Sequence, residues 1–190
     1  MKNTLKCLVS LFLGICLIMP VPMNIFAHET DQVIAVEVSE NETYYFSTQE
    51  DYHSYLKHQE SNGSGIQPHG EFTTTQEIAR QNLNMKFVGY HRLTPTWTKA
   101  AAYTIRANES STAKINGSFN GLSYTLTVTH SLGVDTTIPA DRNRFSRLAH
   151  YGDFVVKHMR TNYHDQSGIY DTYDYISTQT INTYLLVQYQ

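Results

Sequence analysis

Histidine, aspartate and serine are plentiful in this chain, and the first question is whether their spacing supports chemistry. His150 and His158 are eight residues apart and would share one face of a straight strand. Together with His164 and either Asp153 or Asp165, they would supply the imidazole and carboxylate ligands of a metal site. This spacing is not distinctive of a ligand set, so half-exposed histidines of a sheet and turn aspartates are the favoured interpretation.

A second group of carboxylates, Asp165, Asp171 and Asp174, would offer oxygen ligands to calcium. Asp171 and Asp174 are three residues apart on a predicted strand and therefore point to opposite faces, which favours turn and surface carboxylates. The sequence has no G-x-S-x-G, no H-E-x-x-H and no glycine-rich phosphate loop. We therefore predict no catalytic residue, no metal, no cofactor and no enzymatic activity.

Tyrosines form the first group of candidate binding residues. The chain contains 14 of them, and tyrosine suits both a half-buried pleated surface and a binding face. The predicted binding face consists of Tyr163, Tyr170, Tyr173 and Tyr175.

Three arginines and the only tryptophan form the second group. Arg142, Arg144 and Arg147 lie in and just after a predicted loop. They would either bind an anionic surface, such as phospholipid or cell-wall polymer, or remain solvated. Trp97 would either contact sugar or membrane from an exposed loop, or cover the end of a core.

The first 27 residues have the pattern of a secretory signal peptide. Lys2 and Lys6 precede the apolar run Cys7–Met19, and the segment ends with the small residue Ala27. Cleavage after Ala27 and secretion are expected; an uncleaved anchor and a lipoprotein at Cys16 are the weaker alternatives. The remaining chain then has no cysteine for a disulfide. It keeps 12 basic and 17 acidic residues, a formal charge of −5, which excludes the basic excess that nucleic-acid binding requires.

Composition divides the mature chain at a linker rich in Gly, Ser and Pro, predicted over residues 61–76. Residues 28–60 are predicted to form a small β-hairpin followed by a helix, which begins with Ser47 and Glu50 at the capping-box spacing. This unit is too small to be stable alone, so it is either a removable pro-segment or docks on the main domain. Residues 77–190 alternate as seven or more strands and predict an all-β fold, an antiparallel β-sandwich.

The most informative segment is Ser111–Ser131. Asn120-Gly121 is the strongest two-residue hairpin signal, because a type I′ turn needs positive φ at both central positions. Folding the chain there places apolar residues opposite one another on one face and Ser, Thr and Asn on the other. The large members of the apolar face are Ile115, Phe119, Leu122, Tyr124, Leu126 and Val128. A second reversal is predicted at residues 164–168.

Each arm of this hairpin is nine residues long, and a tilted membrane-spanning strand needs 9–11. The Ser/Thr-rich alternation, followed by Thr136-Thr137-Ile138-Pro139, resembles the membrane-inserting region of aerolysin-type pore-forming toxins. The resemblance implies a toxin that inserts this hairpin into membranes.

A second resemblance concerns the C-terminal part. It is similar to small secreted β-domain proteins of Gram-positive bacteria through Ile138-Pro139-Ala140-Asp141, Ser146-Arg147-Leu148 and Val187-Gln188-Tyr189, and it implies export and the same fold. Two functions stay open. The expected one is a secreted, non-catalytic β-sandwich protein that binds a cell-surface, cell-wall or protein partner. The alternative is the β-pore-forming toxin.

Overall fold

The computed structural model describes residues 33–63 and 71–190. The predicted leader, its cleavage site after Ala27, both cysteines and the linker residues 64–70 lie outside the described residues. The chain is 70% strand and 7% helix, so the predicted all-β class is confirmed. In chain order the elements are β1 (Ile34–Ser39), β2 (Glu42–Phe46), α1 (Gln49–Gly63), β3 (Phe72–Tyr90), β4 (Thr98–Lys99), β5 (Ala102–Ile105), β6 (Ser110–Phe119), β7 (Leu122–Ser131), β8 (Thr136–Pro139), β9 (Phe145–Asp165) and β10 (Gly168–Tyr189).

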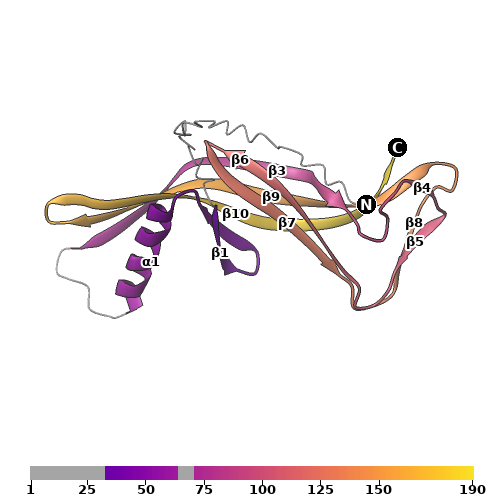
Figure 1. The fold of residues 1–190 in the computed structure, drawn as a ribbon, viewed down its shortest axis with the longest axis horizontal. Coiled ribbons are helices and arrows are strands. Elements are labelled where there is room, and N and C mark those ends of the chain that lie inside the picture. The colour runs from indigo at the N-terminus through magenta and orange to yellow at the C-terminus, as the bar shows by residue number, and fades with distance from the viewer. Residues whose placement is uncertain (1–32, 64–70) are drawn as a thin grey trace, which may run out of the picture. The chain divides into compact units, whose positions relative to one another are not determined.

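The main sheet is antiparallel and has the order β1-β2-β10-β9-β3, with β4 added beside β9 (Figure 1). Its central strands β9 and β10 are 21 and 22 residues long. The chain reverses between Asp165 and Gly168, which confirms the second predicted turn. Large side chains on both faces of β9 and β10 suit this central position, because both faces are covered over part of their length.

Strand β3 begins earlier than the sequence predicts. The sequence predicts residues 72–76 as part of the linker, but Phe72 pairs with His164 and Thr75 with Thr161 on β9. Most side chains in this half of β3 are exposed on both faces, so the segment has no alternation of apolar and polar residues to reveal it. Threonine's preference for extended backbone is the only sequence signal there.

The N-terminal unit docks on the main sheet, as one of the two alternatives predicted. Strand β2 pairs with the outer edge of β10 over Ile176–Gln179, and α1 packs its aromatic side over the neighbouring part of β10 (Figure 1). The helix is capped by Thr48, whose Oγ1 accepts a hydrogen bond from the Asp51 amide at 3.0 Å. The sequence predicts the cap at Ser47 with Glu50, one residue earlier than the structure has it. Removal of this unit as a pro-segment stays a prediction.

Two further two-stranded sheets complete the fold. The β6–β7 hairpin lies against the main sheet and forms a second layer, and β5–β8 continues from its base (Figure 1). The main core lies between the hairpin and the sheet. Its buried members are Tyr45, Val88, Ala113, Tyr124, Leu126, Val128, Phe154, Val156 and Ile176.

Candidate functional site

The β6–β7 hairpin is the element that the sequence predicts most completely. Asn120 and Gly121 have φ values of 52° and 82°, as a type I′ turn requires. The register runs from Ser110 opposite Ser131 to Phe119 opposite Leu122, and it reproduces every pair predicted from the sequence. The two strands form a sheet of their own, so the hairpin is held to the rest of the fold mainly through its side chains.

The apolar face of the hairpin packs on the main sheet. Leu126 and Val128 are 3% and 0% exposed, and they contact the core together with Phe154 and Ile176. Strand β6 approaches β3 closely at Gly89, where an added Cβ would lie 3.0 Å from the Cβ of Ala113. Glycine at this position therefore lets the two layers close together.

The opposite face of the hairpin is polar. Thr112 and Thr129 share a hydrogen bond of 2.8 Å across the strands, and Thr125 donates to Asn116 at 3.0 Å. Lys114 is the one charged side chain on this face of the two strands. Cross-strand hydroxyl pairs of this kind stabilise the ladder without any contact to the main sheet.

The N-terminal unit holds the hairpin from the side. The Tyr45 hydroxyl, on β2, donates a hydrogen bond of 2.6 Å to the backbone carbonyl of Thr125 on β7. Beside this contact, a groove lies between the polar face of the hairpin, β1–β2 and β10, and seven of its sixteen lining residues are threonines. The tyrosine therefore connects the main sheet to the hairpin backbone itself.

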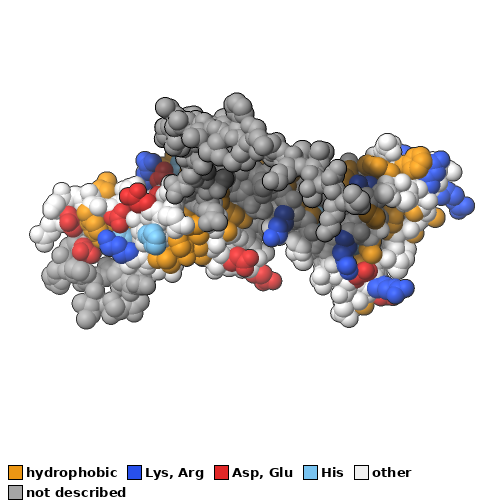
Figure 2. Space-filling view, in the orientation of Figure 1, with side chains coloured by type: hydrophobic (Ala, Val, Ile, Leu, Met, Phe, Trp, Pro, Cys, Tyr) orange, Lys and Arg blue, Asp and Glu red, His pale blue; other side chains and the backbone are white. Residues whose placement is uncertain are grey.

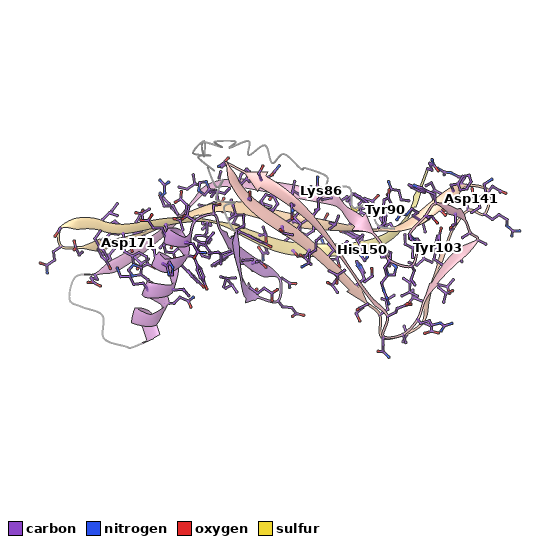
Figure 3. All side chains as sticks on the ribbon, viewed as in Figure 1. Lys86, Tyr90, Tyr103, Asp141, His150 and Asp171 are labelled. Atoms are coloured by element: carbon purple, nitrogen blue, oxygen red, sulfur yellow. The ribbon has the colours of Figure 1, made fainter. Side chains whose placement is uncertain are left out.

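A cluster of three histidines holds the base of the hairpin (Figure 3 labels His150). His150 on β9 is fully buried and contacts Ser111 Oγ through Nε2 at 3.0 Å and His130 Nδ1 through Nδ1 at 3.2 Å. The His91 ring stacks on His150 at 5.3 Å. Burial, with the adjacent His130 and His91, lowers the pKa of His150 to about 4. Burial likewise lowers the pKa of His130 and that of His91.

The hairpin is joined to the sheet through a bend with arms of equal length. In the β5–β8 ladder, Ile105 lies opposite Thr136. Four residues follow on each arm, 106–109 and 132–135, and the β6–β7 ladder then begins with Ser110 opposite Ser131. The two ladders therefore share one register on either side of the bend.

The predicted tyrosine face is wrong for three of its four members. Tyr163, Tyr173 and Tyr175 are only 6–7% exposed, because they pack in an aromatic cluster beneath α1 and β2. Tyr170 is 43% exposed and stays at the surface. In the sequence, tyrosines that a helix buries and tyrosines that form a binding face show the same pattern, because the pattern does not reveal where the helix packs.

The predicted arginines and tryptophan lie at the end of the sheet where β4 pairs with β9. Arg147 lies 3.6 Å above the Tyr90 ring and 5.8 Å from the Trp97 ring, an arrangement favourable for cation–π attraction. Arg144 lies over the Tyr189 ring at 4.2 Å. Arg142 and Arg144 are exposed, and Trp97 is half-buried.

The histidines and aspartates considered for metals contact separate partners: His164 contacts Thr74, Asp153 accepts from the Tyr184 hydroxyl, and Asp165 accepts from the Ser167 amide. Asp174 binds Arg160 in two hydrogen bonds and contacts His158 at 3.1 Å, and the Arg160 guanidinium holds the pKa of Asp174 below its usual range. Asp171 contacts His58 at 3.0 Å. No group of three such side chains among the described residues is arranged to hold a metal ion.

Comparison with protein-family models, curated proteins and solved structures finds no match for this chain. Within the described part of the chain, no helix has both the length and the apolar character needed to cross a membrane.

Proposed function

We propose that the chain is an exported pore-forming protein and that the β6–β7 hairpin is the segment that enters the target membrane. One observation carries the proposal. The hairpin is a separate two-stranded sheet, apolar toward the main sheet and polar on its other face, and it is connected through a bend that preserves its register.

The dimensions of the hairpin suit a tilted membrane-spanning pair. Each strand has 10 residues, within the 9–11 that such a strand needs. The side chains that now face the sheet would face lipid, and the Ser, Thr and Asn side chains would line an aqueous lumen together with Lys114.

The bend allows the hairpin to extend without re-pairing its hydrogen bonds. If residues 106–109 and 132–135 straighten, one ladder runs from Ala102 opposite Pro139 to the turn at Asn120. Ile105 then lies on the same face as the apolar side chains of the hairpin, although Glu109 and the pair Ser111–His130 interrupt the apolar pattern between them.

Water favours the packed arrangement, because extension would uncover the apolar face. Fully burying one large apolar side chain is worth ~1.5–3 kcal/mol, so exposing the three that are buried and the three that are half-buried costs on the order of 10 kcal/mol. A bilayer buries the same face again. Contact with a membrane therefore removes the hairpin's share of this cost, while the sheet side chains that it covered, such as Phe154 and Ile176, become exposed.

Burial of the tyrosines places this function above the secreted binding module. A binding face built on Tyr163, Tyr173 and Tyr175 would require α1 to move away. Pore formation requires only that the β6–β7 hairpin leave the main sheet, and this hairpin already forms a two-stranded sheet of its own.

A reversible lock between the hairpin and the sheet tests the proposal. In a chain with Cys7 and Cys16 replaced by serine, Gly89→Cys with Ala113→Cys introduces one disulfide between β3 and β6. The 3.0 Å between these Cβ positions must open by about half an ångström to reach usual disulfide geometry. We expect release of a trapped dye from phospholipid vesicles to fall to background when the pair is oxidised and to return on reduction.

The matched control is a disulfide inside the hairpin, Thr112→Cys with Thr129→Cys, whose hydroxyls are 2.8 Å apart. It leaves the hairpin free to move as a unit and should leak like the parent in both redox states. The proposal is wrong if the parent chain releases no dye, with or without limited proteolysis. It is equally wrong if a verified β3–β6 crosslink leaves the release unchanged.

A further inference from the structure

Charge is unevenly distributed along this chain, although its overall charge is small. The two segments that flank the hairpin, residues 91–109 and 132–147, contain six basic and three acidic side chains. The N-terminal unit, residues 33–63, contains one basic and six acidic side chains. Figure 2 shows Lys and Arg beside hydrophobic side chains over β4, β5 and β8, and acidic side chains over β1.

We name the basic end the surface formed by the exposed Lys99, Arg142 and Arg144 with the neighbouring Trp97 and Phe145. Phe145 is 47% exposed although it is apolar, and the Lys99 ammonium lies 5.1 Å from its ring. Pairs of this kind keep a cation and an apolar ring together at the surface.

An aromatic layer supports the basic end from within the sheet. Tyr90 and Trp97 meet edge to face at 5.6 Å, and Phe87 meets Tyr90 at 5.0 Å. Arg147 covers Tyr90 and also donates from Nε to the Thr94 carbonyl at 2.7 Å. The tryptophan ring is therefore held in place at the edge of a rigid sheet (Figure 3 labels Tyr90).

We infer that the basic end is the surface that docks on an anionic phospholipid bilayer, an inference that rests on the proposed pore-forming function. Each basic residue close to an anionic bilayer contributes attraction, and tryptophan and tyrosine favour the level of the lipid headgroups. The acidic N-terminal unit is repelled by the same surface.

The position of the basic end in the fold supports this partner over a soluble one. Its side chains come from the segments through which β3 and β9 continue into the hairpin. A hairpin that extends through the β5–β8 ladder leaves the sheet from this end. Docking here is a first contact, which holds the end of the sheet from which the hairpin departs beside the bilayer before the hairpin extends.

Binding to vesicles tests the inference directly. The probes are vesicles of phosphatidylcholine alone and vesicles with a quarter of phosphatidylglycerol, compared by co-sedimentation in about 0.1 M salt, where screening acts over about 10 Å. Trp97 is the only tryptophan, so a blue shift of its emission reports entry of this surface into the headgroup region.

We compare the wild-type chain with Arg142→Gln/Arg144→Gln. At roughly fivefold per basic residue, the double variant should bind anionic vesicles roughly 25-fold more weakly. The control Arg80→Gln/Lys157→Gln removes the same charge at a cross-strand pair further along β3 and β9, and it should bind like wild type. Circular dichroism confirms that both variants are folded.

The two proposals fail separately. If wild type binds anionic vesicles through the basic end but never releases dye, pore formation is wrong and docking stands. Equal binding to neutral vesicles, equal loss in both double variants, or retention only by an anionic wall polymer would each overturn docking, whether or not dye is released.

Discussion

Acidification should destabilise the packed hairpin, because the imidazole at its base is buried in the neutral form. His150 is 0% exposed, and its pKa is lowered to about 4 by burial first and then by His130 and His91. The charged groups near the cluster are Glu109, which favours the protonated form of His91, and Arg92, which disfavours it.

The direction and size of this loss of stability follow from the linkage between proton binding and folding. The unfolded chain binds a proton at this histidine below about pH 6.5, whereas the folded chain binds it only near pH 4. Stability is therefore complete above pH 6.5 and is lost as the pH falls from 6.5 to 4. A difference of about 2.5 pKa units corresponds to about 3 kcal/mol. His91 and His130 act in the same direction.

Urea unfolding at several pH values between 7.5 and 4 measures this loss. His150→Gln keeps a polar side chain but removes the titration, so its free energy of unfolding should depend less on pH even if the variant is less stable at pH 7.5. His53→Gln, at an exposed position of α1, is the control and should keep the wild-type slope. Equal slopes for His150→Gln and wild type would refute the assignment of a buried neutral imidazole.

Three further predictions concern the packing that holds the hairpin. Leu126→Ala should lower the free energy of unfolding by about 2–5 kcal/mol in urea titrations, because this core side chain is 3% exposed; Thr127→Ala, on the exposed face, should change it by less than about 0.5 kcal/mol. Gly152→Val should cost at least about 1–3 kcal/mol in the same titrations, because an added Cβ would lie 2.5 Å from the buried Phe154 ring; a stability equal to wild type would show that the ring has another place to go. Tyr45→Phe removes the hydrogen bond to the β7 backbone and should cost about 1 kcal/mol, and faster hydrogen exchange in β7 than in β9 would show that the loss is local.

The β6–β7 hairpin could be predicted from sequence because two independent local signals agree. Asn120-Gly121 fixes where the chain reverses, and the period-two pattern of both arms then permits only one register. In the strands of the main sheet, a turn signal and a period-two pattern do not reinforce each other in this way. The first half of β3 is exposed on both faces, so no pattern marks it, and its pairing depends on β9, more than 70 residues away in the chain.

The histidine cluster could not be predicted, because its members come from three distant parts of the sequence. The sequence groups His150 with His158 and His164 on one strand, while the fold groups it with His91 and His130. The same is true of the aromatic cluster under α1, where burial depends on a helix that precedes the tyrosines by about a hundred residues. Local patterns predict which side chains share a face, but not what covers that face.

One polar pair on the apolar face of the hairpin bears both on how the hairpin packs in water and on how it would insert into a membrane. Ser111 and His130 lie opposite one another on the otherwise apolar face, and on the sheet both contact His150. From Ala113 to Phe119 this face presents an unbroken apolar stretch of seven residues per arm, about 23 Å at ~3.3 Å per residue. The lipid-facing band of a membrane β-barrel is about 25 Å tall, and a strand tilted by about 45° covers only about 16 Å of it with this stretch. The serine and the histidine would therefore lie inside the band near its edge, so the polar pair that anchors the hairpin in water would also limit the depth to which it inserts.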